Sequence, residues 1–331
     1  MAMGRHRKTN RHLPQRVYMK HGAFYFVTHE SKWIFLGKNY ATAMHEWAKL
    51  VGQSQKVTHM ADLFDRYMLE VAPSKAAQTY KDNQREIKPL RLFFGDMRPE
   101  NVEPIHVYKY LDTRGKKAKV RANREKSLLS HIFSKAIEWG IVRDNPCKDV
   151  KRRTEKPRDR YVEDWELRTL VDGAPELIRH YVAFKYLTGL RQQDILNLRL
   201  DALQKDGIHV TTRKTGKRII IEWNEDLRTV VDAIRSMRNI KSLHLFGTRK
   251  GQPYSADGFR SIWHRCMFKA IREGRVKQRF TEHDIRAKSG TDADASGLSA
   301  QELLGHEDAG TTRRYIRHKQ AQKVTPLRKK Y

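Results

Sequence analysis

The sequence predicts a multidomain protein that is mainly α-helical and carries small β elements. Apolar side chains recur at helical spacing along most of the chain. β-branched and aromatic residues concentrate in two short regions, 17–36 and 207–223. The 331 residues exceed one average domain, and a hydrophobic share of 39% is enough for sizeable cores. We therefore expect three folded parts, of which the first and the last contain strands.

Residues 1–56 are expected to form a three-stranded sheet backed by one helix. The runs 17–28 and 33–36 are β-branched and aromatic with glycines between them, whereas 41–51 shows helical periodicity. A basic arm with few acids precedes the sheet and favours contact with a polyanion. The cations of this arm are Arg5, Arg7, Lys8 and Arg11.

Residues 57–155 are expected to form a helical domain. Its first helix has an apolar stripe at i, i+3, i+4 and i+7, formed by Met60, Leu63, Phe64 and Tyr67. Further helices are expected over 76–94, 104–111 and 123–139. The charged run 151–160, which includes Pro157, has the composition of an exposed linker. We therefore expect the last domain boundary within this run.

Residues 160–331 are expected to form a mixed domain in which helices dominate. The stretch 207–223 predicts two strands joined by the turn Lys214-Thr-Gly-Lys217. Helical spacing returns on both sides of this hairpin. The hairpin is therefore the β element of the third domain.

The charge balance indicates the class of partner. Lys and Arg total 67 against 38 Asp and Glu, which gives a formal net charge of +29 and favours nucleic acid. No window approaches the roughly 18 apolar residues of a membrane-spanning helix, and no apolar signal core follows the N-terminus. Cys147 and Cys266 lie far apart and form no Cys-x-x-Cys pattern. We expect a soluble protein of the reducing cytoplasm that does not interact with membranes.

Two segments of the third domain carry isolated cations. Gly189 ends one helix and places Arg191 at the start of the next, where a cation is unfavourable. Lys214 and Lys217 stand at the hairpin turn, from which a flexible ammonium can reach a phosphate. Taken alone, each segment has an ordinary explanation as a surface arginine or a solvated turn.

Two later segments carry histidines and a tyrosine. His283 and Arg286 are three residues apart and share one helix face. Ser299 begins a short capped helix that leaves His306 at a turn, and Tyr315 is expected on a following helix among arginines. A buried structural tyrosine is the ordinary explanation. A metal site made by His283, His306 and His318 is disfavoured because their spacing matches no zinc pattern.

In this order the segments resemble the signature of the tyrosine recombinase (phage integrase) family. The signature is Thr-Gly-Leu-Arg at 188–191, a lysine hairpin, His-x-x-Arg at 283–286, Leu-Gly-His at 304–306 and Tyr315. Residues 57–155 resemble the family's helical, SAM-like core-site-binding domain, and 1–56 resemble the arm-site-binding domain of lambda-type phage integrases. One departure is Asp194, which stands where the family commonly has Glu.

The resemblance implies a site-specific recombinase that cleaves and rejoins DNA through a 3′-phosphotyrosyl intermediate, integrating and excising phage or mobile-element DNA. It assigns Tyr315 as nucleophile and Arg191 and Arg286 as the clamp on the phosphate oxygens. Lys214 would protonate the leaving 5′ oxygen, with Lys217 as the alternative and a DNA contact in either case. His283 and His306 would assist proton transfer and bind the phosphate. No metal or cofactor is expected.

The resemblance also implies partners: double-stranded DNA with core and arm attachment sites, a homotetramer on that DNA, and a host DNA-bending protein and an excisionase as helpers. The reaction would take place in the cytoplasm of a bacterial host. Two alternatives are a DNA-binding regulator without catalysis and a type IB topoisomerase, which shares the tyrosine chemistry but needs no arm-binding domain. The ordered motif set favours the recombinase.

Overall fold

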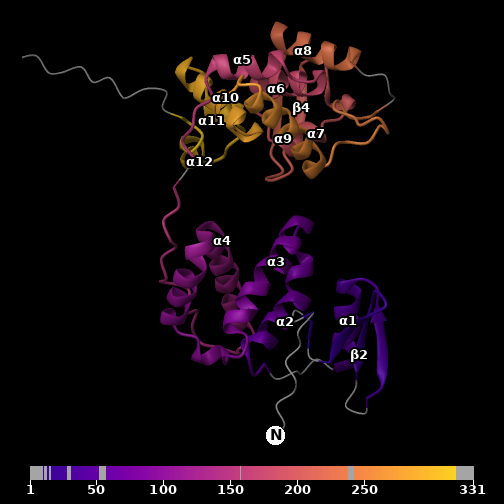
Figure 1. Ribbon diagram of the computed structural model, residues 1–331, viewed down its shortest axis with the longest axis vertical. Helices are drawn as coiled ribbons and strands as arrows, with labels where there is room; N and C mark the ends of the chain where they lie inside the picture. The colour runs from indigo at the N-terminus through magenta and orange to yellow at the C-terminus, as the bar shows by residue number, and fades with distance from the viewer. Residues whose placement is uncertain are drawn as a thin grey trace, which may run out of the picture. The chain divides into compact units, whose positions relative to one another are not determined.

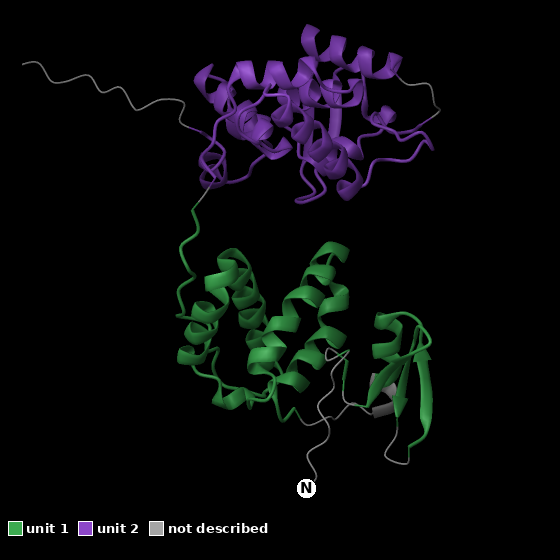
Figure 2. Ribbon diagram, viewed as in Figure 1, with its two compact units in different colours: residues 1–156 green, residues 157–331 purple. Residues whose placement is uncertain are grey.

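The computed structural model of the protein describes residues 10, 13–14, 16–27, 31–51, 57–156, 158–237 and 242–317, without the side chains of 48–51. The chain forms two compact units, Met1–Lys156 (unit 1) and Pro157–Tyr331 (unit 2), which are described separately below (Figure 1; Figure 2). The arm residues predicted to bind DNA lie outside the described residues; they are Arg5, Arg7, Lys8 and Arg11.

Unit 1 begins with the predicted three-stranded sheet and helix. The elements are β1 (Val17–Lys20), β2 (Ala23–Val27), β3 (Trp33–Gly37) and α1 (Tyr40–Val51). The strands are antiparallel in the order β1-β2-β3. Val17, Phe24 and Leu36 are buried on one face together with Trp47 of α1. The alternation of the strands thus places a second set of aromatic residues on the opposite face.

The rest of unit 1 is helical. Its elements are α2 (Met60–Glu70), η1 (Ala72–Ser74), α3 (Ala77–Phe94), η2 (Pro99–Asn101) and α4 (Pro104–Glu138). The predicted apolar stripe of α2 is buried. The helices predicted over 104–111 and 123–139 are both longer than expected, because α4 continues through the charged residues between them and is interrupted only at Ala118. This part of the helix could not be predicted, because its sequence is rich in charge and lacks apolar periodicity.

The C-terminal end of unit 1 is hydrogen-bonded to α4. The Asn123 side chain accepts a hydrogen bond from the Arg153 backbone N–H at 2.9 Å and donates to the Arg153 carbonyl at 2.7 Å. Its amide also donates to the Glu155 carboxylate at 2.7 Å. The predicted linker is therefore exposed but attached along its first half.

Unit 2 is a mixed, mainly helical domain, as the sequence predicts (Figure 1). Its helices are α5 (Asp164–Asp172), α6 (Glu176–Thr188), α7 (Gln192–Leu196), η3 (Leu200–Ala202), α8 (Glu225–Ser236), α9 (Ala256–Arg272), α10 (Glu282–Ala295), α11 (Ala300–Leu303) and α12 (Ala309–Arg313). β4 (Gly207–Thr211) and β5 (Arg218–Glu222) form the predicted antiparallel hairpin.

The core of unit 2 surrounds α6. Tyr181 and Phe184 are fully buried and contact the rings of Phe246 and Phe259. Helices α8 and α10 pack against α6, and residues 284–291 of α10 are buried without a break. An all-round buried helix cannot have a polar face, so its charged side chains must find partners inside the protein.

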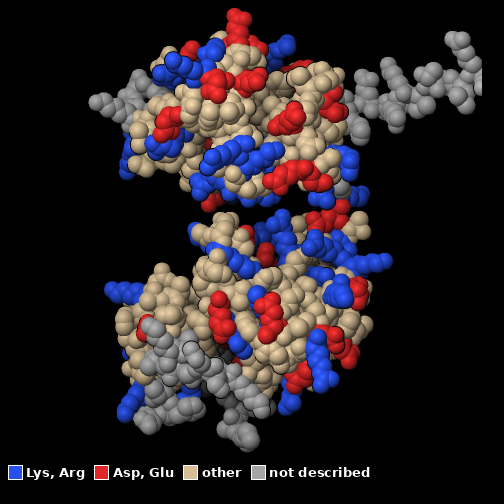
Figure 3. All heavy atoms as spheres, turned by 180° about the vertical axis from the view of Figure 1, so that it is seen from behind, with Lys and Arg blue, Asp and Glu red and all other residues tan. Residues whose placement is uncertain are grey.

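The charge on the face shown in Figure 3 agrees with a nucleic-acid partner. Lys and Arg side chains are spread over both units in Figure 3, and a run of them crosses the lower part of unit 2 in this view. Asp and Glu side chains are interspersed with them. Among the described helices, none combines the length and the apolar character needed to cross a membrane.

Candidate active site

The centre of the site is the guanidinium of Arg286, which is only 1% exposed. It donates hydrogen bonds to the carbonyl oxygens of Gly189 and Leu304, the latter at 2.6 Å. Its Nη2 also lies 3.0 Å from Nε2 of His306. Burial, followed by the nearby charge of Arg191, lowers the pKa of Arg286 to about 10. Arg286 therefore stays charged at neutral pH, although no carboxylate pairs with it within the described part of the chain.

Two glycines allow the surrounding loops to approach α10. Gly189 ends α6 in the left-handed conformation with φ of +60°, and a Cβ there would lie 3.1 Å from the Leu304 side chain. A Cβ at Gly290 would lie 2.7 Å from the same side chain. Glycine is therefore needed for this close approach. The loops that carry Arg191 and His306 both meet Arg286 as a result.

His306 follows the turn at the end of α11 and is 4% exposed. Arg286 can only donate, so Nε2 of His306 must accept, and its Nδ1–H donates to Thr312 Oγ1 at 3.1 Å. This pattern fixes one neutral tautomer. Desolvation, and then the charges of Arg286 and Arg191, lower the pKa of His306 to about 4. The imidazole is therefore neutral at physiological pH.

Tyr315 is half-buried and packs its ring against these groups. The ring centroid lies 4.9 Å from that of His306 and 5.2 Å from Cζ of Arg286. Contrary to the expectation from sequence, Tyr315 is not on a helix: α12 ends two residues earlier, and Tyr315 stands in the turn that follows. Its N–H donates to the Thr312 carbonyl at 2.8 Å.

The ring of His283 also packs against the ring of Tyr315. His283 lies in the first turn of α10, one turn before Arg286, and its ring centroid is 5.2 Å from that of Tyr315. The residue as a whole is exposed, but the protein around its ring lowers its pKa by desolvation. A neutral imidazole beside the phenol is a suitable base.

Arg191 is placed at the N-cap of α7, as predicted, with an extended backbone. It is half-buried, and its side chain makes no hydrogen bond or ion pair to any other described residue. It nevertheless lies close enough to Arg286 to oppose that residue's charge. Two neighbouring guanidiniums that form no ion pair with a described carboxylate are suited to bind an anion.

The charges of the hairpin lysines act on the same region. Lys214 is exposed at the turn and Lys217 is half-buried, and the charges of both contribute to the lowered pKa of His306. The turn is closed by the Thr212 N–H, which donates to the Lys217 carbonyl at 2.8 Å. The structure thus brings every predicted catalytic residue to one region, with Arg286, His306, His283 and Tyr315 in direct contact and the lysines at its edge.

Comparisons with known proteins find a matching family model and similar sequences. Residues 162–322 match the model of the phage integrase family. These residues form a domain of the tyrosine recombinase family. The chain is similar to the tyrosine recombinase XerC of Leptospira interrogans (24% identical over 251 residues, 69% of this chain and 79% of that protein). It is also similar to the integrase of Mycobacterium phage L5 (23% identical over 263 residues, 72% of this chain and 68% of that protein).

The fold comparison extends over nearly the whole chain. A structure of a lambda integrase dimer bound to a COC′ core site matches with a TM-score of 0.67 and 19% identity, covering 98% of this chain and 99% of that one. This likeness shows that the multidomain recombinase fold predicted from the sequence is present. As a tyrosine recombinase, the protein is a site-specific enzyme that cleaves and rejoins DNA strands.

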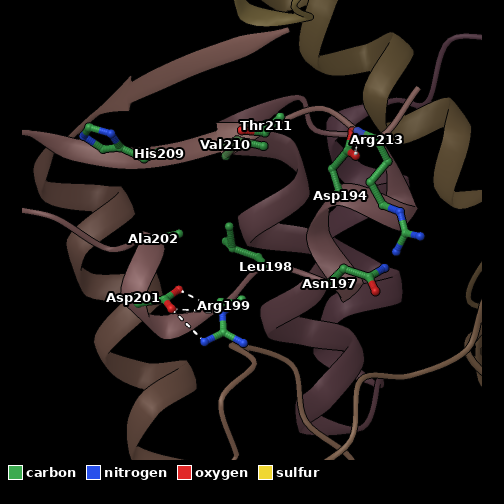
Figure 4. A pocket seen from close by; sticks show the side chains of 10 residues that line it. All are labelled: Asp194, Asn197, Leu198, Arg199, Asp201, Ala202, His209, Val210, Thr211 and Arg213. Carbon is green, nitrogen blue, oxygen red and sulfur yellow. Dashed lines mark hydrogen bonds and ion pairs between the residues drawn. The ribbon is translucent and has the colours of Figure 1, made fainter. Parts of the chain in front are cut away.

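Asp194, the departure from the family's usual Glu, connects two parts of the recombinase site. Its Oδ1 accepts a hydrogen bond from the Arg213 N–H at 3.0 Å, next to Lys214 on the hairpin. Its Oδ2 is buried and has no partner among the described residues. Asp194 and Arg213 lie at one end of a cavity of about 180 Å³, and the Arg199–Asp201 ion pair lies at the other (Figure 4). Asp194 therefore ties α7 to the hairpin.

Sequence reasoning missed Lys185, which is fully buried in α6. Its ammonium pairs with Glu282 at 2.6 Å and donates to the Leu190 carbonyl at 3.0 Å. It thereby joins the start of α10 to the loop before Arg191. The signal available in the sequence was its place inside the apolar run Tyr-Val-Ala-Phe-Lys-Tyr-Leu, where a solvated lysine is unexpected.

Over the described ranges, no group of three or more His, Cys, Asp or Glu side chains is placed to hold a metal ion. His318, the third member of the disfavoured histidine site, lies outside the described residues.

Proposed function

We propose that the protein is a phage-type integrase whose nucleophile is Tyr315. Its proposed catalytic partners are Arg191, Lys214, His283, Arg286 and His306. The single observation that carries the assignment is the contact of the Tyr315 ring with a buried arginine and two imidazoles, all within 5.2 Å. A phenol that only filled a core would not need a buried guanidinium and two imidazoles around its ring.

In the proposed reaction the phenol oxygen attacks a DNA phosphate, and the bond from phosphorus to the 5′ oxygen breaks. The product is a 3′-phosphotyrosyl link that conserves the bond energy for rejoining. Arg191 and Arg286 would hold the two non-bridging oxygens as negative charge builds up on them. Arg191 is suited to this because its guanidinium is not committed to a partner within the described protein.

We assign the proton transfers to the histidines and, by the family resemblance, to the hairpin lysine. His283 faces the Tyr315 ring and, as a neutral base, would accept the phenol proton. Lys214 would supply the proton to the departing 5′ oxygen, with Lys217 as the alternative. His306 accepts from Arg286 and so orients that guanidinium toward the phosphate. Rejoining reverses the same steps.

The remaining parts of the chain are proposed to bind DNA. We assign 1–56 to arm sites, 57–155 to core sites and 160–331 to catalysis. Unit 1 contains two separate hydrophobic clusters, which supports a division within it. The outer face of its sheet exposes Tyr18, Trp33 and Phe35, with a lysine over the Trp33 ring, and a β-ribbon of this kind can enter a major groove.

The assembly and its helpers are also proposed. A solved structure similar to this chain is a lambda integrase tetramer bound to a Holliday junction. We propose that this chain likewise acts as a homotetramer on attachment-site DNA in the cytoplasm of its host. A host DNA-bending protein and an excisionase would direct it toward integration or excision, and the arm cations Arg5, Arg7, Lys8 and Arg11 would contact phosphates.

The proposal is tested with Tyr315→Phe, which removes one oxygen and keeps the ring. DNA affinity should survive, whereas the denaturation-resistant adduct between protein and nicked DNA should disappear. Tyr331→Phe is the matched control and should form the adduct normally. An adduct that persists in Tyr315→Phe would overturn the assignment.

A further inference from the structure

The buried hydroxyl of Thr291 contacts the backbone of Tyr315 and of Arg317, two residues further along the chain. Thr291 lies in α10 and is 4% exposed. Its Oγ1 accepts a hydrogen bond from the Arg317 N–H at 2.8 Å and lies 3.3 Å from the Tyr315 carbonyl oxygen. It also donates to the Ala287 carbonyl of its own helix at 2.8 Å. One side chain therefore connects α10 to the segment that carries the phenol.

The segment needs such a connection because it has no regular structure of its own. After α12 ends, the Tyr315 N–H donates back to Thr312, which holds only the first half of the segment to its own helix. In the part of the chain that the structure describes, Thr291 is the residue outside 309–317 that hydrogen-bonds the backbone of Tyr315 and Arg317. Without it, the backbone of 315–317 would keep, among the described residues, only its hydrogen bonds to the Thr312 carbonyl.

The helix that supplies this hydroxyl also supplies Arg286 and His283. The distance from phenol to guanidinium therefore depends on how firmly the Tyr315 segment is attached to α10. Placement errors of about 1 Å at a reacting group can cost about a hundredfold in rate. A single buried hydrogen bond at this point can consequently control the rate without touching the DNA.

We propose that Thr291 is a positioning residue that holds the nucleophile segment against α10, so that the Tyr315 phenol stays in register with Arg286. This inference rests on the proposed role of Tyr315 as nucleophile. The hydroxyl oxygen is the essential atom, because the Arg317 N–H would otherwise be left without its buried acceptor. The methyl group of threonine contributes packing only.

The decisive variants are Thr291→Val, which keeps the shape and removes the hydroxyl, and Thr291→Ser, which keeps the hydroxyl. Single-turnover formation of the covalent adduct on a suicide core-site substrate should be at least about tenfold slower in Thr291→Val. It should be close to the wild-type rate in Thr291→Ser. Affinity for the same DNA should be unchanged in both, because Thr291 is buried.

Thr169→Val is the matched control. The Thr169 hydroxyl makes the same kind of bond to its own helix, to the Trp165 carbonyl at 2.7 Å, on α5. It therefore reports the cost of losing that bond from a threonine without any change at the tyrosine. Its adduct formation should equal that of the wild type.

Amide hydrogen exchange provides a readout that general destabilisation does not mimic. The Arg317 amide should exchange faster in Thr291→Val, and protection in the core helix α6 should be unchanged. If Thr291→Val does not fold, Thr291→Ala and Thr291→Ser are compared in the same two assays. The expected order of both adduct rate and Arg317 protection is then wild type, Ser, Ala.

The outcomes separate this inference from the assignment of the nucleophile. An adduct in Tyr315→Phe would overturn the proposed function and the role of Thr291 together. Loss of the adduct in Tyr315→Phe, with wild-type rate and exchange in Thr291→Val, would overturn the role of Thr291 alone. Equal slowing in Thr291→Val and Thr169→Val, or a Thr291→Ser variant as slow as Thr291→Val, would also contradict it.

Discussion

Arg191 and Arg286 both carry a guanidinium, but their side chains differ in the hydrogen bonds that they make within the protein. Arg286 is enclosed and donates to two carbonyl groups and a histidine. Arg191 has no such intramolecular bond within the described chain and raises the electrostatic energy of its neighbour. Arg286 therefore also holds the loops of the site together, whereas the guanidinium of Arg191 is available to bind the substrate.

Arg191→Ala should therefore lower the cleavage rate by at least about a hundredfold, the usual scale for removing a donor to a developing oxyanion. Its melting temperature should stay the same or rise slightly, because repulsion with Arg286 is removed. Arg199→Ala, which removes an exposed arginine paired with Asp201, is the control and should cleave normally. Rapid cleavage of a suicide substrate by Arg191→Ala would exclude the clamp.

His306 should make stability depend on pH. Its pKa is about 4 in the folded protein against 6.5 for an ordinary histidine, so the unfolded chain takes up the proton first as pH falls. The free energy of unfolding that His306 contributes is complete above pH 6.5 and is lost between pH 6.5 and 4, by at most about 1.4 kcal/mol per pH unit. His306→Gln should show a shallower loss over this range in chemical denaturation. Parallel curves for both proteins would contradict the lowered pKa of His306.

The sequence could predict the candidate catalytic side chains, but it could not predict the residues that position them. The order of arginine, lysine, histidine and tyrosine motifs was sufficient to select the candidate set. Lys185 and Thr291 were missed because their partners, Glu282 and Arg317, are identified only by contacts through space. Nothing in their local sequence encodes those partners.

At the scale of elements, the hairpin is attached to α7 by one short side chain. Asp194 accepts from the backbone next to Lys214, so the position of the lysine turn follows the helix that begins at Arg191. The strands themselves were predictable from β-branched alternation and the glycine turn. The attachment was not, because it depends on a carboxylate reaching a backbone amide 19 residues away.

Lys214→Ala should slow cleavage of ordinary DNA strongly and should cleave a substrate with a 5′-bridging sulfur nearly as fast as the wild type. A thiolate leaves without protonation, so the general acid is no longer needed. Lys217→Ala should be affected much less on ordinary DNA. If sulfur rescued Lys217→Ala and not Lys214→Ala, the general acid would be Lys217.

Two helical elements show where periodicity fails. The middle of α4 is rich in charge and was not predicted, although its backbone is helical on both sides of Ala118. Conversely, a helix was expected around Tyr315, but α12 stops at Arg313. In each case contacts elsewhere in the unit decide the backbone, and local propensity is too weak to do so.

At the scale of the whole molecule, DNA binding and chemistry are proposed to reside in different parts of the chain. All six catalytic candidates lie in unit 2, whereas the sheet and its exposed aromatic face lie in unit 1. The net charge of +29 indicated the polyanionic partner from composition alone. Composition could not indicate which DNA sites the two parts of unit 1, each with its own hydrophobic cluster, are proposed to bind.

Removing residues 1–56 should abolish footprints on arm sites and retain cleavage of isolated core sites. The cluster that contains α2 and α3 does not depend on the sheet for its buried residues, so the shortened protein should unfold cooperatively in a thermal scan. A cooperative but catalytically dead protein, or one that still protects arm sites, would refute this division.

The central claim is that Tyr315 becomes covalently joined to DNA. It is tested most directly by trapping the adduct on a suicide substrate, digesting it and locating the modified residue by mass spectrometry. The phosphodeoxynucleotide should be found on Tyr315, attached through a 3′ phosphate. Its attachment to any other residue, including Tyr331, would contradict the mechanism.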